Sequence, residues 1–116
     1  MYPLILHKNL NEKKWFRYPL SQQVLMIANE LNRAKNFMLS GKFTEVNSCY
    51  ERAFELVDLT SADPKWSGNR LKELRRFREL LAQLYISEDK NNELNHTLYL
   101  GLLRLSSEAY RALYPM

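Results

Sequence analysis

The chain has 116 residues, of which 46% are hydrophobic and 26% charged, and its formal net charge is +4. These values are typical of one folded domain with a single core, which we expect over residues 1–116, and they argue against a disordered or collagen-like chain. No run approaches the roughly 20 apolar residues of a membrane-spanning helix, so the sequence excludes a transmembrane protein.

The first 18 residues show no helical periodicity, and we expect them to form an irregular N-terminal arm. Within this arm, Tyr2, Leu4 and Leu6 alternate in the manner of a short extended segment that lies against the rest of the chain or against a partner. The first apolar run comes before its positive charges, the reverse of a secretory signal, which predicts a cytoplasmic protein.

Leucine occurs 21 times, whereas valine, isoleucine and threonine together occur nine times, which favours helix over strand. A first helix is predicted from Pro19 to Gly41, because proline suits a first turn and glycine a helix end. A second helix follows from Phe43 to about Thr60. The apolar stripe of the first helix is Leu20, Val24, Ile27, Ala28, Leu31, Ala34 and Met38, and that of the second is Phe43, Val46, Tyr50, Ala53 and Val57.

A third helix begins either at Asp63-Pro64 or after Gly68, and the polar run 87–92 ends it. A fourth helix begins at Asn91 or Asn92 and continues to Leu113. The stripe of the third helix contains Leu71, Leu74, Phe77 or Arg78, Leu81, Leu84 and Tyr85, and that of the fourth contains Leu94, Leu98, Leu102, Leu105, Ala109 and Leu113.

Short connections force neighbouring helices to run in opposite directions, because a short link cannot carry the chain back to its starting end. The sequence therefore predicts an all-α fold, an antiparallel up-down-up-down four-helix bundle over residues 19–114 with the arm 1–18 attached. Tyr50 and Ala53 are expected to face the first helix.

Residues 30–58 resemble a tetratricopeptide helix hairpin. The matching positions are Ala34, Phe37, Gly41, Val46, Tyr50, Ala53 and Leu56. The resemblance implies antiparallel packing of two helices that cross closely at small residues. It does not imply a peptide-binding superhelical groove, because such arrays need about three repeats and the chain has no second copy.

The sequence predicts no catalytic, cofactor-binding or metal site. His7 and His96 are its only histidines, and Glu93 with His96 supplies at most half of a two-metal bundle site. The single cysteine, Cys49, lies beside Tyr50 on an apolar stripe, so we expect a small buried side chain rather than a reactive thiol. A phosphate-binding glycine loop is also missing. We expect a protein without enzymatic activity or small-molecule substrate.

Charge is distributed unevenly along the chain. Residues 1–42 carry seven Lys/Arg and two acidic side chains, residues 43–63 carry one and five, and residues 64–90 carry seven and four. The acidic second helix is therefore expected to form surface ion pairs with its two basic neighbours. Alternatively, the basic strip on the third helix contacts nucleic-acid phosphates. The candidate phosphate contacts are Arg70, Lys72, Arg75 and Arg76.

Aromatic residues alternate with cations in the arm at 13–18, a composition that packs on the bundle or anchors a partner. The fourth helix also carries apolar residues off its stripe, including Leu100 and Tyr110, which favours a second buried face and hence a homodimer or another protein partner. The candidate partner contacts are Trp15, Phe16, Tyr18, Tyr99 and Leu103. The sequence thus predicts a small helical interaction or adaptor protein that self-associates, with a nucleic-acid-binding regulator as the alternative.

Overall fold

The computed structural model describes residues 10–115, and helices occupy 77% of them, with no strand in that range. The prediction of an all-α fold is therefore confirmed. The six helices are α1 (Glu12–Phe16), α2 (Leu20–Leu39), α3 (Phe43–Ser61), α4 (Gly68–Ile86), α5 (Asn92–Leu103) and α6 (Ser107–Leu113). The expected extended segment at Tyr2, Leu4 and Leu6 lies outside the described residues.

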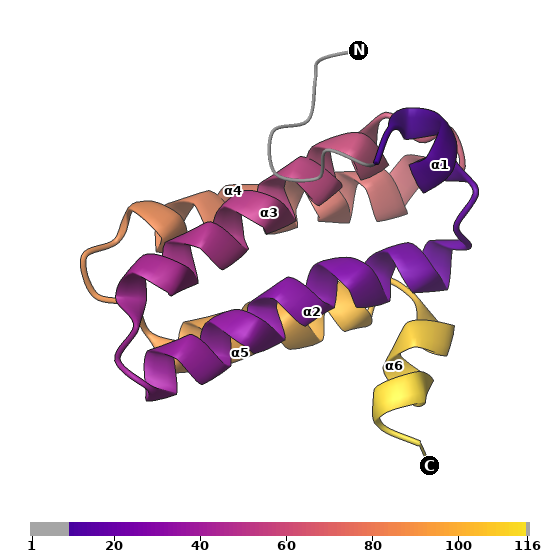
Figure 1. Ribbon diagram of the computed structural model, residues 1–116. Coiled ribbons are helices and arrows are strands. Elements are labelled where there is room, and N and C mark those ends of the chain that lie inside the picture. The colour runs from indigo at the N-terminus through magenta and orange to yellow at the C-terminus, as the bar shows by residue number, and fades with distance from the viewer. Residues whose placement is uncertain (1–9, 116) are drawn as a thin grey trace.

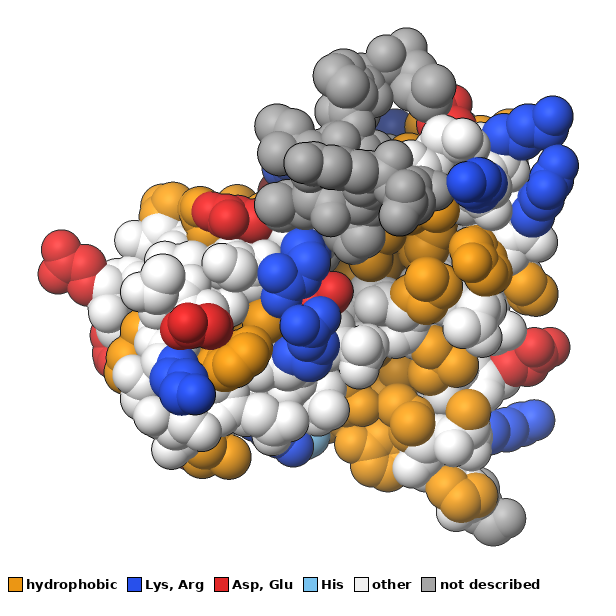
Figure 2. All heavy atoms as spheres, viewed as in Figure 1, with side chains coloured by type: hydrophobic (Ala, Val, Ile, Leu, Met, Phe, Trp, Pro, Cys, Tyr) orange, Lys and Arg blue, Asp and Glu red, His pale blue; other side chains and the backbone are white. Residues whose placement is uncertain are grey.

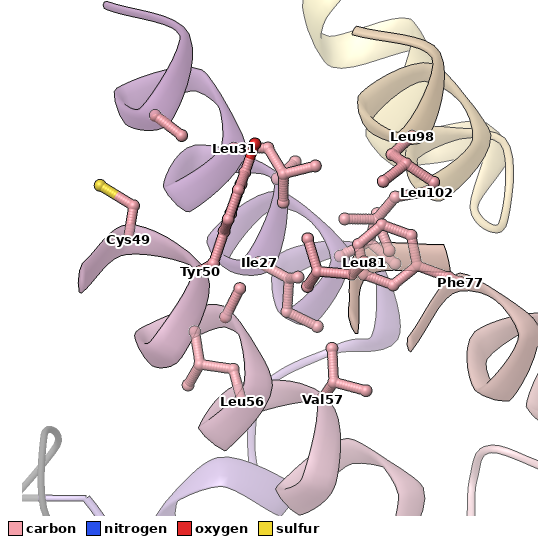
Figure 3. Packing of buried hydrophobic residues seen from close by; sticks show 14 of the residues in the cluster. Ile27, Leu31, Cys49, Tyr50, Leu56, Val57, Phe77, Leu81, Leu98 and Leu102 are labelled. Atoms are coloured by element: carbon pink, nitrogen blue, oxygen red, sulfur yellow. The ribbon is translucent and has the colours of Figure 1, made fainter. Parts of the chain in front are cut away.

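The four long helices pack in a ring around one core (Figure 1). Helix α2 lies against α3 and α5, and α4 completes the ring by contacting the same two neighbours. The close-up shows side chains from all four helices meeting in the centre (Figure 3). They include Ile27 and Leu31 of α2, Tyr50 and Val57 of α3, Phe77 and Leu81 of α4, and Leu98 and Leu102 of α5.

The turn between α2 and α3 depends on Gly41, which has φ = +72°, a conformation that side chains with a Cβ rarely adopt. Its N–H donates to Met38 O at 3.1 Å and thereby closes the end of α2. Tyr50 and Ala53, expected to face the first helix, are both fully buried on α3. Helix α3 packs directly against α2.

Polar atoms in the centre of the ring are matched by hydrogen bonds. The Tyr50 hydroxyl donates to Asn95 Oδ1 at 2.7 Å, and Asn95 Nδ2 donates to Leu31 O at 3.0 Å. Burial raises the pKa of Tyr50 far above its usual range, so its hydroxyl stays a donor. This chain of bonds joins α3, α5 and α2 where an unpaired polar group would be costly.

The arm is not irregular throughout, which corrects the prediction for residues 12–16. Asn11 caps the one-turn helix α1, because its side chain accepts the Lys14 N–H at 2.9 Å. Glu12 in the first turn favours the same helix end. The sequence shows no helical periodicity here because a helix of five residues is too short to repeat a pattern.

The predicted fourth helix is broken into α5 and α6. The N–H groups of Leu105 and Ser106 donate to carbonyls three residues earlier, Leu102 O and Leu103 O, which tightens the last turn of α5. The Ser106 hydroxyl then accepts the Ala109 N–H at 3.2 Å and starts α6. The chain changes direction here, and α6 packs on α2 (Figure 1).

Candidate interaction surfaces

Trp15, predicted to contact a partner, is fully buried within its own chain. Its indole Nε1 donates to Thr60 Oγ1 at 2.9 Å, and the ring of Tyr18 meets it edge-on, with centroids 5.8 Å apart. Phe16 is half-buried against the core, whereas Tyr18 stays exposed. Of the three candidate contacts in the arm, Tyr18 therefore offers the most surface.

A buried polar network holds the end of the molecule where Trp15 lies. The Gln23 side chain has no exposed surface, and its Nε2 donates to Trp15 O at 3.0 Å and to Asp63 Oδ2 at 2.9 Å. Its Oε1 accepts the indole N–H of Trp66 at 2.8 Å. One glutamine thus ties α1 and the loop between α3 and α4 to α2.

Lys65 completes this network from the surface. Its Nζ donates to Phe16 O at 2.9 Å and pairs with Asp63 Oδ2. Burial alone would raise the pKa of Asp63, but hydrogen bonds from Lys65 and Gln23 outweigh that effect and lower the pKa. The Asp63 carboxylate is therefore held in its charged form.

Leu103 is also predicted to contact a partner, but it has no exposed surface. Tyr99, predicted for the same role, is half-buried. The expectation that Leu103 points outward is wrong. The predicted stripe treated residues 91–113 as one helix, whereas α5 ends at Leu103 and α6 turns onto α2, so that side of α5 is enclosed. Conversely Leu94, expected in the core, has 54% of its surface exposed.

Acidic α3 pairs with basic α4 as the charge pattern predicts. Arg78 Nε donates to Asp58 Oδ1 at 2.7 Å, and the same guanidinium lies 5.1 Å from the centre of the Phe54 ring. Between α3 and α2 the charges are the opposite of those predicted: α3 supplies the cation, Arg52, which donates to the buried Glu30 of α2 at 3.1 Å. A buried carboxylate needs such a partner.

The basic strip is only partly free. Arg70 Nε donates to Leu105 O at 3.0 Å, which fixes the start of α4 to the break between α5 and α6. Lys72, Arg75 and Arg76 are exposed and have no ion pair with another described residue. The structure therefore leaves three of the four predicted phosphate contacts unoccupied, while Arg78 beside them is paired with α3.

The sequence did not predict one feature, a cluster of exposed apolar residues at one end of the molecule. We call Leu39, Phe43 and Ile86 the end surface; they lie at the α2–α3 turn and at the end of α4, both on the left in Figure 1. Their exposed fractions are 74%, 49% and 78%. Phe43 and Ile86 line one hollow of about 440 Å³ together with Asn47, whose buried Oδ1 accepts no hydrogen bond.

Lys90 fixes the loop that carries this surface. Its Nζ donates to the carbonyls of Leu84, Tyr85 and Ser87 at the end of α4. Desolvation lowers the pKa of Lys90 because these contacts draw the ammonium inward. The end surface is therefore presented by an ordered loop.

Hydrophobic side chains also gather over the first half of α2 and over α6, at the right of Figure 2. A hollow of about 550 Å³ on this side is lined by Leu25, Met26, Tyr99 and Leu113. Polar residues of α2, including Gln22 and Asn29, form much of the remaining wall. This hollow is therefore lined by apolar and polar side chains together.

The remaining candidate residues for a metal or thiol site are separated from one another in the described range. No group of three or more His, Cys, Asp or Glu in that range converges on a metal position. Cys49 is free and buried, as expected, and burial raises the pKa of its thiol. His96 is exposed and stacks on Tyr99, and His7 lies outside the described range. No described helix is long and apolar enough to cross a membrane, and the cytoplasmic location stays a prediction.

No family model, curated protein or solved structure matches this chain. The tetratricopeptide resemblance of residues 30–58 therefore remains a prediction.

Proposed function

We propose that this protein is a non-enzymatic helical interaction protein that associates with itself through the end surface. The observation that supports this proposal is the exposure of Leu39, Phe43 and Ile86 at one end of the molecule. Phe43 and Ile86 line one hollow and Leu39 is exposed at the same end of the molecule, and exposed large apolar side chains favour burial in an interface over contact with water. Phe43 gives this surface the aromatic anchor that interfaces favour.

The charges around the end surface suit a second copy of the chain. Lys42 at the α2–α3 turn and Glu88 and Asp89 in the α4–α5 loop are all exposed. A twofold axis lets the lysine of one copy face the acidic loop of the other, so the mixed signs become complementary. A surface of one sign would repel itself in the same arrangement.

For the architecture, we propose an antiparallel up-down-up-down arrangement of α2, α3, α4 and α5. The ring of contacts α2–α3, α3–α4, α4–α5 and α5–α2 supports it, together with the short connections between successive helices. In this arrangement the α2–α3 turn and the α4–α5 loop share one end, as the end surface requires.

Nucleic-acid binding through α4 has weaker support than self-association. Arg70 and Arg78 are engaged within the chain, and Glu73 and Glu79 lie among the remaining cations. A strip of three cations diluted by two carboxylates provides few phosphate contacts.

Sedimentation equilibrium at about 50 μM, a concentration at which micromolar dimers form, tests the proposal. The parent should have a mass near twice 13.8 kDa, and Ile86→Lys should shift it toward 13.8 kDa, because a charge at the centre of an apolar interface is costly. Asn29→Lys, which adds the same charge to exposed α2 surface, is the control and should stay dimeric. A parent mass near 13.8 kDa would refute self-association.

A further inference from the structure

A second apolar surface runs between α4 and α5, separate from the end surface. Two hollows of about 280 and 250 Å³ follow the line where these helices meet, and both are lined by Leu80, Thr97 and Leu98. We call this feature the α4–α5 groove. Leu80 and Leu94 are the large apolar side chains that open most widely onto it, being 41% and 54% exposed.

The length of the groove fits a helix. Its lining on α5 runs from Leu94 to Gly101, about 10 Å or two helical turns at 1.5 Å per residue, and Arg104 and Leu105 of the following turn extend the groove to about three turns. An amphipathic helix of that length presents apolar side chains at i, i+3 or i+4 and i+7, and this spacing matches a groove between two helices.

Gly101 supplies an independent observation for close approach of another backbone. It lies inside α5 and lines the groove, and a Cβ added there would meet nothing within 4 Å. Glycine inside a helix costs roughly 0.5–1 kcal/mol relative to alanine. Since nothing in the described chain requires this glycine, the open space at the groove floor is available to a helix that packs closely from outside.

The charges that border the groove indicate the charge of the partner. Arg76 and Arg104 line its end nearest the start of α4, and Lys72 and Arg75 lie on the adjoining exposed face. Only two carboxylates, Glu73 and Glu79, lie among these four cations. None of the four cations forms an ion pair with another described residue. This excess of one sign fits an acidic partner better than a second copy of a chain whose net charge is +4.

We infer that the α4–α5 groove binds an acidic amphipathic helix of a partner protein, about three turns long. Its apolar side chains fill the space between Leu80, Leu94 and Gly101, and its acidic side chains face Arg76 and Arg104. The inference rests on the proposed role as an interaction protein and adds a second binding surface to it. The cations that the sequence associated with nucleic acid thereby border a protein-binding groove.

Two fluorescein-labelled peptides of about 14 residues, enough for three to four helical turns, serve as probes in fluorescence anisotropy at about 50 mM salt. Both carry Leu at i, i+3, i+4, i+7 and i+11, and one has Glu where the other has Lys at the flanking positions. The Glu peptide should bind the parent at least about tenfold more tightly, and Arg76→Glu should reduce or invert that preference.

Gly101→Leu provides the sharpest variant, because it adds a side chain at the groove where a Cβ meets no atom of the described chain within 4 Å. It should fold at least as stably as the parent, since leucine favours helix, yet bind the Glu peptide at least about tenfold more weakly. Gln22→Leu places the same side chain on exposed α2 surface and should bind normally.

The inference would be overturned if neither peptide bound the parent up to about 1 mM, a range that covers weak complexes. It would also be overturned if both peptides bound the parent equally, or if Gly101→Leu bound the Glu peptide as tightly as the parent does. Binding of a single-stranded oligonucleotide that Arg76→Glu abolishes and the Glu peptide does not displace would instead assign these cations to nucleic acid. A dimeric parent that binds no peptide would remove this inference and leave the proposed self-association intact.

Discussion

Replacing Gln23 by leucine tests whether the buried polar network stabilises the fold. The substitution keeps a side chain of similar volume but removes the acceptor for Trp66 Nε1 and the donor to Trp15 O and Asp63 Oδ2. Asp63 Oδ2 keeps its contact with Lys65 and Trp15 O keeps the N–H of Tyr18 at 3.2 Å, so the Trp66 indole N–H is the buried group left without a partner. An unpaired buried group costs about 1–3 kcal/mol, each of the two other lost hydrogen bonds about 0.5–1.5 kcal/mol, and the added apolar burial returns about 1 kcal/mol.

We therefore expect Gln23→Leu to lower the free energy of unfolding by about 2–4 kcal/mol, a large share of the roughly 5–15 kcal/mol typical of a domain. Urea unfolding followed by far-UV circular dichroism measures it, and tryptophan fluorescence reports on Trp15 and Trp66 directly. The neighbouring Gln22 is exposed, so Gln22→Leu should change the free energy by no more than about 0.5 kcal/mol. If the two variants unfolded at the same urea concentration, the network would contribute nothing and this reasoning would be refuted.

Ala53→Asp should destabilise the chain by about 3 kcal/mol or more, because Ala53 is fully buried on α3, whereas Ala112→Asp on exposed α6 should have little effect in the same urea assay. The pKa of Asp63 is lower in the folded chain than its ordinary value of 3.8, so its ionised form stabilises the fold above that pH and this contribution is lost as the pH falls toward the lowered pKa. The gap in unfolding free energy between the parent and Asp63→Asn should therefore be wide at about pH 6 and narrow at about pH 3, and a gap independent of pH would contradict the linkage. Cys49 should react with a thiol reagent only on unfolding, since it is buried and its thiol pKa is raised; reaction of the native chain at the rate of a free thiol would contradict this.

The sequence by itself determined the helical class and the main apolar faces. In α2, the residues predicted for the stripe from Val24 to Met38 are all buried, because a helix repeats every 3.6 residues whatever its neighbours are. Gly41 and the polar run before Asn92 likewise marked helix ends through local backbone chemistry. Cys49 was recognised as buried from its place on the stripe.

Only the tertiary structure decided which residues outside the stripes are covered. Trp15 is buried because Thr60 and Gln23, distant in sequence, supply its polar partners, and no local pattern contains that information. Leu103 is buried because two backbone bonds and one serine cap turn the chain after α5 and bring α6 onto α2. Leu94, at the other end of α5, is exposed although its stripe predicts burial. The end surface and the α4–α5 groove also arise from long-range packing: each residue in them lies on an ordinary amphipathic helix, and exposure depends on where the neighbouring helices stop.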